Sequence, residues 1–458
     1  MVKSLARHVA WLGLKLLARC HLHALLVPIF GRVIRELDAE GNLHPVNPDG
    51  GAGKFTVLAL SCEYYRKDPQ VLAGMPGVRV LAMPQRWQTR LIFQFYDQGF
   101  HWFQYMNPPA GSVLVQQKVK LRNFLRGFLP RLYRRLGVDC VIAPHIHFYP
   151  DGDWGAVSHE VGYPFVVLQR ENMVLAKYLR EHVSWRVKHI GHFEGTKVIV
   201  HNRHMRELYL DAGIVQPKQI EALGCIRMDS FVAKAKQAAP PHNARKRIVY
   251  FPFYLGTTFD EPIRPFFNAA HVALVEFTAE HPDVDVLIKP KEKFYPKWRD
   301  DFDQAMALAG LSPEKIRNLT IRCEGDAQEI IMQADVVSGL QTTTLLEAAL
   351  AGRPVVIPYF KEMDDPEYDA RTMFRESFDH FDVARDAAEY KRQLHWRLSH
   401  STLEPEKREA IADVFSNFVS DVNGGATERY VTALQSARSG AGTRKGNAAA
   451  LGVAPRSA

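Results

Sequence analysis

The 458-residue sequence has few cysteines and no paired cysteine motif. Its five cysteines are far apart and none occurs as CxxC, so we expect buried free thiols in a reducing compartment rather than a disulfide framework or a zinc site. A long apolar run is also lacking. The longest uncharged stretch of the N-terminal segment runs from Cys20 to Gly31, which is shorter than the roughly 20 residues of a membrane-spanning helix. There is no clean small-x-small cleavage site, which argues against a secretory signal.

The charge of the chain is moderate. A hydrophobic fraction of 47%, a charged fraction of 24% and this length indicate a globular protein with two domains. The net charge of +8 is compatible with nucleic acid, anionic lipid or phosphorylated substrates as partners. No nucleic-acid recognition motif is present, and the basic character is not sustained along the chain. We therefore expect no nucleic-acid partner.

The N-terminal segment is basic and amphipathic. On a helical wheel the basic residues share one half and most apolar residues the other, the basic set being Lys3, Arg7, Lys15 and Arg19. This pattern is typical of a helix lying on an anionic membrane surface, and a helix packed on the protein's own core is the alternative. A second basic stretch, residues 116–137, follows an aromatic segment. We predict a cytoplasmic protein that is peripheral at the inner face of the cell membrane.

Apolar runs of strand length alternate with helix-like segments along the rest of the chain. Such alternation predicts parallel sheets covered on both faces. The pattern lapses around a Pro-Pro pair near residues 232–245 and then begins again. We predict an α/β fold with two doubly wound parallel-sheet domains. The predicted parts are a basic N-terminal segment, an N-terminal domain, a C-terminal domain and a disordered tail: residues 1–45, 46–235, 236–435 and 436–458.

The stretch from Val336 to Phe360 carries the clearest chemical signal. A strand ends at Gly339, and the threonines at 342–344 precede a helix-like run that contains Glu347. In a parallel sheet the strand's carboxyl end faces the ligand site, and the next helix starts there with free N–H groups and a positive dipole end. Threonine hydroxyls beside those groups suit phosphate, and a carboxylate one turn later suits a ribose diol. The alternative is an ordinary threonine N-cap with Glu347 as an exposed or capping acid.

Several segments carry a resemblance to a known family. "ADVVSGLQTTTLLEAALAGRPVVIPY" resembles the donor-binding strand–turn–helix–strand of GT-B glycosyltransferases of the bacterial surface-carbohydrate type (capsule and lipopolysaccharide biosynthesis) and of related polyol-phosphate transferases. "KVIVHNRHMRELYLDAGIVQPKQIEALGCIRMDSF" is similar to the end of their first domain. "RKRIVYFPFYLGTT" and "VLIKPKEKF" are similar to parts of their second domain. The likeness covers roughly residues 135–365. The first 130 residues carry no matching motif.

The resemblance implies two Rossmann-like domains facing across a cleft, with a nucleotide-sugar as donor substrate and no other cofactor. The second domain would hold the donor. Thr342, Thr343 and Thr344, after Gly339, would contact the diphosphate, and Glu347 the ribose. Gly256 and Thr257 would let the loop after the first strand approach the donor. Lys289 would neutralise phosphate charge as the nucleotide leaves. The loop "RCEGDAQE", residues 322–329, would recognise the base.

The resemblance assigns residues to the acceptor site less directly than to the donor site. Inverting glycosyl transfer needs a base on the first domain. Glu171, at the end of a strand in "LQRENM", is the candidate, and Arg170 would bind an anionic acceptor or orient that carboxylate. A salt-bridged acid at a helix N-terminus is the alternative for Glu171. The His-Gly pair of the polyol-phosphate transferases is absent here, which counts against phosphoryl-type transfer.

The stretch "HIHFYPDGD" offers His145, His147, Asp151 and Asp153 as possible metal ligands. No third cluster supports a metal site, so we predict a metal-independent enzyme. The favoured function is a glycosyltransferase that moves a sugar to a cell-surface polysaccharide or a lipid-linked saccharide. A polyol-phosphate transferase, a sugar-nucleotide epimerase and a non-catalytic membrane-surface module are the alternatives.

Overall fold

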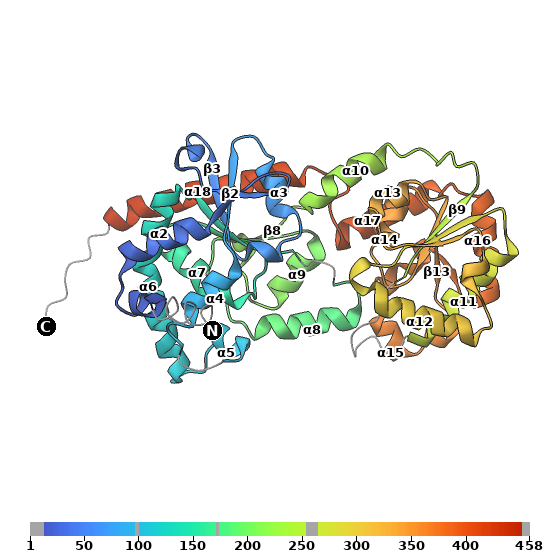
Figure 1. Cartoon of the computed structure of the whole chain (residues 1–458), viewed down its shortest axis with the longest axis horizontal. Coiled ribbons are helices and arrows are strands. Elements are labelled where there is room, and N and C mark those ends of the chain that lie inside the picture. Colours follow the sequence, from blue (N-terminus) through green and yellow to red (C-terminus); the bar gives the residue numbers. More distant parts are fainter. Residues whose placement is uncertain (1–12, 97–99, 171–173, 253–263, 451–458) are drawn as a thin grey trace, which may run out of the picture. The chain divides into compact units, whose positions relative to one another are not determined.

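A computed structural model of the chain describes residues 13–96, 100–170, 174–252 and 264–450. The chain forms two compact units (Figure 1). Unit 1 comprises residues 1–172, 184–227 and 425–458, and unit 2 comprises residues 173–183 and 228–424. These units differ from the predicted domains because the end of the chain returns to unit 1 and a short segment of the first half belongs to unit 2. In that segment Leu175 accepts a backbone hydrogen bond from Phe374, and Arg180 pairs with Glu376 at 3.0 Å.

Unit 1 is built on an eight-stranded sheet in the order β2-β1-β4-β3-β5-β6-β7-β8. The six strands from β4 to β8 in this order are parallel, and β1 joins β4 antiparallel. The strands are β1 Arg35–Leu37, β2 Leu43–Pro45, β3 Phe55–Ala59, β4 Val78–Ala82, β5 Cys140–Ala143, β6 Phe165–Leu168, β7 Lys197–Val200 and β8 Ile220–Ala222. The predicted strands of this half are all present, and the β1–β2 hairpin was not predicted.

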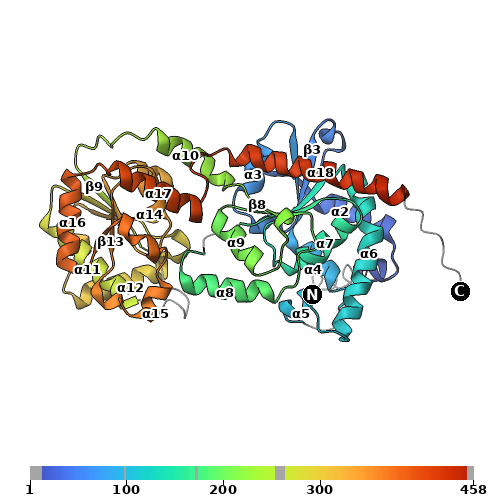
Figure 2. The ribbon, with the colours of Figure 1, turned by 180° about the vertical axis from the view of Figure 1, so that it is seen from behind.

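Helices cover both faces of this sheet (Figure 2). On one face α3 and α18 pack over a core that includes Val57, Ile142 and Tyr430. On the other face α7 packs on β5 and β6, and α6 packs on α7. Because both faces are covered, β3 to β6 are buried along their whole length. The helices of unit 1 are α2 His23–Val33, α3 Asp68–Ala73, α4 Gln85–Ile92, α5 Trp102–Met106, α6 Val113–Leu136, α7 Tyr149–Glu160, α9 Arg203–Asp211 and α18 Ala426–Ala450. Helix α8, Lys177–Lys188, begins in unit 2 and ends in unit 1.

The C-terminal tail and the N-terminal segment both differ from what the sequence predicts. Residues 436–450, expected to be disordered, continue helix α18, and Ala437 is buried. Residues 451–458 lie outside the described residues. Near the N-terminus, α2 packs against α6 with Leu26 and Phe30 fully buried, so α2 packs on the protein's own core. Residues 1–12, with most of the predicted amphipathic helix, lie outside the described residues.

Unit 2 has a six-stranded, wholly parallel sheet in the order β11-β10-β9-β12-β13-β14. This is the order 3-2-1-4-5-6 of dinucleotide-binding doubly wound sheets. The strands are β9 Arg247–Phe251, β10 Asp285–Ile288, β11 Leu319–Ile321, β12 Val336–Gly339, β13 Val355–Pro358 and β14 Asp382–Ala384. The helices are α10 Asp229–Lys236, α11 Arg264–Glu280, α12 Tyr295–Leu308, α13 Ala327–Met332, α14 Thr344–Leu350, α15 Pro366–Arg371, α16 Ala387–Ser399 and α17 Pro405–Phe418. The prediction of two doubly wound parallel-sheet domains is therefore confirmed.

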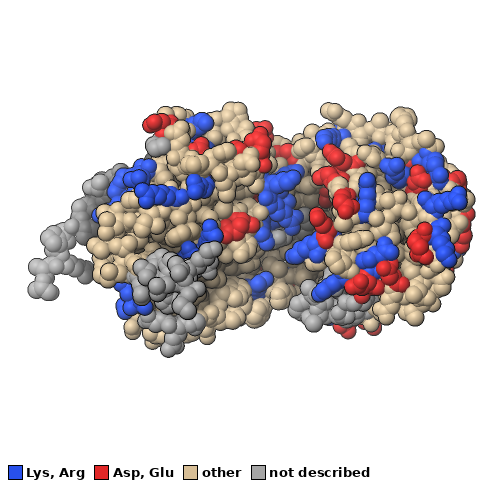
Figure 3. Space-filling view, in the orientation of Figure 1, with Lys and Arg blue, Asp and Glu red and all other residues tan. Residues whose placement is uncertain are grey.

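The surface charge of unit 2 is mixed. On the face drawn in Figure 3, Lys and Arg side chains lie among Asp and Glu side chains rather than in one continuous stripe. A groove for a nucleic-acid backbone requires basic side chains that are clustered on one face. That face of unit 2 does not have this pattern. Among the residues that the structure describes, no helix combines the length and apolar character that crossing a membrane requires.

Candidate functional site

The centre of the unit 2 sheet is the point where its strand order reverses, between β9 and β12. Doubly wound sheets bind ligands outside the carboxyl ends of the strands at this point. Here β12 ends at Gly339, whose register partner on β9 is Phe251. A Cβ on Gly339 would lie 2.6 Å from the carbonyl oxygen of Phe251, so only glycine fits. The predicted Gly339 thus lets the two central strands approach closely at the ligand-binding edge.

The turn between β12 and α14 is held by Gln341, which the sequence did not identify. Gln341 has a left-handed backbone with a φ of 59°. Its Nε2 donates to the carbonyl oxygen of Arg371 at 2.8 Å, and its Oε1 accepts from the backbone N–H of Met373 at 2.7 Å. These bonds stabilise a conformation that a non-glycine residue rarely adopts. No local sequence pattern predicts a non-glycine residue with a left-handed backbone at this position.

The three threonines lie where β12 leads into α14. Thr343 is the N-cap of α14, but its side chain makes no capping hydrogen bond. The hydroxyls of Thr342 and Thr344 are 2.8 Å apart and hydrogen-bond each other, and the N–H of Thr344 donates to the Thr342 hydroxyl at 3.4 Å. The ordinary N-cap alternative therefore does not describe Thr343. Two paired hydroxyls and the start of a helix share one edge, which is a suitable arrangement of donors for an anion.

Glu347 lies in the first turn of α14 and is buried, with 8% of its surface exposed. Its Oε2 accepts from Nε2 of Gln328 at 3.0 Å. Gln328 belongs to α13 and to the loop expected to recognise the base. Glu347 is thus not the exposed acid of the alternative interpretation. The structure joins it to the base-recognition segment, and its ribose contact stays a prediction.

Lys289 follows β10 and points toward the same segment. Its Nζ donates to the carbonyl oxygen of Cys323 at 2.6 Å, and burial is the main cause that lowers its pKa. Strand β9 separates β10 from β12, so Lys289 and the threonines follow strands about 10 Å apart. A contact of Lys289 with a phosphate beside the threonines stays a prediction. Gly256 and Thr257 lie outside the described residues.

The predicted acceptor-side pair is only half described, because Glu171 lies outside the described residues. Arg170 follows β6 at the carboxyl edge of the unit 1 sheet. Its backbone N–H donates to the carbonyl oxygen of Pro144 at 3.0 Å, and its guanidinium donates to the carbonyl oxygen of Tyr64. The guanidinium also lies 5.7 Å from the centre of the Phe148 ring. An acceptor role for Arg170 stays a prediction.

Three of the four residues of this possible metal site have separate partners, whereas Nδ1 of the fourth, His147, has no hydrogen-bond partner in the described part of the chain. His145 accepts from Gln169 at 2.9 Å, Asp151 accepts from Ser61 at 2.7 Å, and Asp153 accepts from Arg122. Across residues 13–96, 100–170, 174–252 and 264–450 there is no group of three or more His, Cys, Asp or Glu side chains that could hold a metal ion. Metal independence of the reaction stays a prediction.

Ser61, Gln88 and Asp151 form a buried polar network that the sequence did not reveal. Ser61 follows β3, and Asp151 opens α7 after β5. Strands β3 and β5 are neighbours where the order of the parallel strands in unit 1 reverses. Gln88 donates to the Asp151 oxygen that also accepts from the Ser61 hydroxyl. The ligand-binding edge of unit 1 therefore has a buried carboxyl group at its centre.

No family model and no curated protein matches the chain. Solved structures do resemble it. The UDP-GlcNAc 2-epimerase of Neisseria meningitidis bound to UDP-GlcNAc is 12% identical over 84% of this chain and 100% of its own, with a TM-score of 0.45. MurG of Acinetobacter baumannii is 14% identical over 84% and 99%, with a TM-score of 0.43. An α,α-trehalose-phosphate synthase (UDP-forming) of Burkholderia xenovorans is 10% identical over 83% and 99%, with a TM-score of 0.44. Likenesses at this level do not assign a function to the chain.

Proposed function

We propose that the chain is a glycosyltransferase that binds a nucleotide-sugar at the carboxyl edge of the unit 2 sheet. It transfers the sugar, without a metal ion, to a cell-surface polysaccharide or a lipid-linked saccharide. The observation that supports this is the position of Gly339, the threonines and Glu347 at the reversal point of a sheet with dinucleotide-binding strand order. The resemblance of this stretch to donor-binding segments of GT-B enzymes agrees with it.

Each residue of this edge has a chemical task in the proposal. The hydroxyls of Thr342 and Thr344 and the start of α14 donate hydrogen bonds to the diphosphate. Lys289 leaves the Cys323 carbonyl and neutralises the charge that develops on the departing nucleotide. Glu347 accepts hydrogen bonds from the ribose diol, with Gln328 holding its carboxylate in place. A base on unit 1 takes the acceptor's proton, for which Glu171 is the candidate.

The test of the donor site is ligand binding to the full chain, measured by saturation-transfer NMR with UDP-, GDP-, CDP- and CMP-sugars. We expect one nucleotide class to bind. Glu347→Ala should weaken that binding at least several-fold, because the ribose hydroxyls lose their acceptor. Glu347→Gln keeps an oxygen for Gln328 and controls for loss of packing. Glu362→Ala removes an exposed acid of the same unit and should leave affinity unchanged.

Four outcomes would contradict the proposal. Unchanged affinity in a folded Glu347→Ala variant would remove the ribose role. Binding to none of the nucleotide-sugars would favour a non-catalytic module of this fold. Conversion of the donor sugar with no acceptor present would indicate an epimerase, and transfer of a polyol phosphate from a CDP-linked donor would indicate a polyol-phosphate transferase.

A further inference from the structure

Unit 1 contains a cavity of about 480 Å³ that none of the predicted roles uses. It lies between the first half of α6, the start of α7 and two loops, residues 106–108 and 190–194. Its volume is within the range of about 300–1,000 Å³ that is typical of small-molecule sites. Its walls are apolar for the greater part, with Met106, Pro108, Ile146, Phe148, Phe165, Ile190, Phe193 and Ile214.

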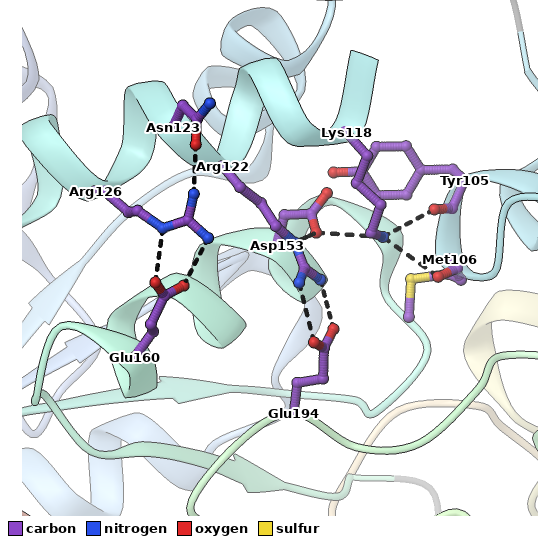
Figure 4. Close-up of polar contacts among 9 residues, drawn as sticks. All are labelled: Tyr105, Met106, Lys118, Arg122, Asn123, Arg126, Asp153, Glu160 and Glu194. Carbon is purple, nitrogen blue, oxygen red and sulfur yellow. Dashed lines mark hydrogen bonds and ion pairs between the residues drawn. The ribbon is translucent and has the colours of Figure 1, made fainter. Parts of the chain in front are cut away.

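One wall of the cavity carries a closed network of ion pairs (Figure 4). Lys118 and Arg122 project from α6, and both bind Oδ1 of the buried Asp153, at 3.2 and 2.7 Å. Arg122 also donates from both terminal nitrogens to the two oxygens of Glu194. These bonds from Arg122 are the main cause that lowers the pKa of Glu194. Two cations thus face two carboxylates, and the wall has no net charge.

Most donors of these two cations are already paired within the wall. Nζ of Lys118 donates to the carbonyl oxygens of Tyr105 and Met106, at 3.0 and 3.3 Å, besides Asp153. Each guanidinium nitrogen of Arg122 donates to Asp153 or Glu194, which leaves two of its five N–H groups for a ligand. A phosphate or carboxylate ligand at those N–H groups would lie beside the carboxylate of Glu194, which repels it. A ligand without charge can instead use the carboxylate and guanidinium edges as they stand.

Asp151 adds a buried group that lacks one partner. Its side chain lines the cavity with 1% of its surface exposed. Oδ1 accepts from Ser61 and Gln88, whereas Oδ2 has no hydrogen-bond partner. Burial raises the pKa of this carboxyl to about 7, so both protonation states are populated near neutrality. A buried polar atom without a partner is costly, so a hydrogen-bond donor that reaches Oδ2 would stabilise the site.

The chemistry of the walls selects one class of ligand. An aliphatic ligand would leave Oδ2 of Asp151 unpaired, and an anion would be repelled by the carboxylate of Glu194. A sugar hydroxyl both donates and accepts, so it can bind Asp151 in either protonation state. The C–H face of a sugar ring can pack on the rings of Phe148 and Phe193. His145 also lines the cavity and is uncharged, because burial, more than the nearby cations, lowers its pKa well below the usual value.

We propose that this cavity of unit 1 binds a neutral sugar unit, with Asp151 and the Arg122–Glu194 pair as its hydrogen-bonding groups. That this sugar unit is the acceptor of the reaction rests on the proposed function. That the cavity binds a neutral sugar does not rest on it. The cavity lies wholly within unit 1, so it can be tested without any nucleotide.

The test is saturation-transfer NMR of the full chain with neutral mono- and disaccharides, with inorganic phosphate and glucuronate as charged probes. We expect at least one neutral sugar to bind and the charged probes not to bind. Glu194→Gln should weaken sugar binding several-fold, because the carboxylate edge is lost. Glu160→Gln is the matched control, since Glu160 pairs in the same two-pronged way with Arg126 of α6 but does not line the cavity (Figure 4).

Two further variants keep the proposal falsifiable. Ile190→Trp fills the cavity and should abolish sugar binding in a chain whose circular dichroism is unchanged. Asp151→Asn should remove the change in sugar affinity that the wild type shows across pH 7, while Asp211→Asn at an exposed position should not. Binding of no neutral sugar, equal binding to the Ile190→Trp variant, or displacement of the sugar by phosphate would each overturn the proposal. Failure of nucleotide binding with sugar binding intact would affect only the donor-site proposal.

Discussion

Asp151 illustrates how burial changes the chemistry of one side chain. Removal from water raises its pKa from 3.8 to about 7, although hydrogen bonds from Ser61 and Gln88 act in the opposite direction. Between those two pH values the folded chain holds a proton that the unfolded chain releases. The stabilising contribution of the protonated form is therefore complete below about pH 4 and is lost as pH rises through 7.

The first prediction follows from this difference. Asp151→Asn keeps an oxygen that accepts from Ser61 and Gln88 but cannot ionise. Its free energy of unfolding should exceed that of the wild type above pH 7, by up to about 4 kcal/mol. The difference should shrink as pH falls toward 4. Urea unfolding between pH 4 and 8 measures it, and Asp211→Asn serves as the exposed control. A constant difference at all pH values would contradict the assignment.

Gly339 gives the second prediction. Gly339→Ala places a Cβ 2.6 Å from the Phe251 carbonyl oxygen, so the two central strands of unit 2 must separate. We expect a loss of more than about 3 kcal/mol in stability and a loss of nucleotide binding. Gly310→Ala is the control, because Gly310 has a positive φ of 70° and open space around its Cβ. It should cost only the left-handed backbone strain, about 1–2 kcal/mol. Equal costs for both variants would refute the close-approach argument.

At the residue level, the sequence predicts a functional site only where the residues of that site are close together in the sequence. Gly339, the threonines and Glu347 are within nine residues of one another on a strand–helix turn, and the structure places them together. Gln341 depends on a backbone angle and on partners 30 residues away, which no local pattern encodes. Asp151 depends on Ser61 and Gln88, which are 90 and 63 residues distant. Its sequence neighbours suggested a metal ligand instead.

At the element level, the buried strands were predictable because both faces are covered, so their residues form continuous apolar runs. The β1–β2 hairpin could not be predicted in this way, because its strands have three residues each and all three residues of β2 are exposed. The amphipathic N-terminal pattern has a mixed outcome. The helical residues 13–19 bury Leu14 and Ala18, whereas Leu16 is 63% exposed and Leu25 of α2 is 58% exposed.

These exposed leucines carry the third prediction. Large exposed apolar residues near Lys15 fit contact with an anionic membrane surface, as expected for the N-terminal segment. The double variant Leu16→Glu with Leu25→Glu should reduce co-sedimentation with phosphatidylserine vesicles several-fold. Leu308→Glu, at a leucine of unit 2 that is 84% exposed, should not. If both variants sediment like the wild type, this surface does not bind the membrane.

At the scale of the whole molecule, the assignment of α18 to unit 1 could not be read from the sequence. Residues 426–435 were predicted as part of the C-terminal domain, and residues 436–458, rich in Gly, Ala and Ser, as a disordered tail. Small residues also let a helix lie close to a sheet, and Ala426, Ala433 and Ala437 are buried against unit 1 together with Leu434. The guanidinium of Arg429 donates to the carbonyl oxygen of Leu223, and the Tyr430 hydroxyl donates to that of Gly224. The first and the last of the described residues therefore belong to the same unit.

The fourth prediction uses this return of the chain. Leu434→Ala removes a fully buried side chain from the core beneath α18 and should cost unit 1 about 2–5 kcal/mol. Hydrogen exchange followed by mass spectrometry should then show faster exchange in β3, β4 and β5, on which this helix packs, than in β9 and β12 of unit 2. Gln435→Ala alters an exposed neighbour on the same helix and should leave both sets unchanged. Faster exchange in the unit 2 strands alone would show that α18 supports the other unit, because a cavity in a packed core weakens the elements that line it.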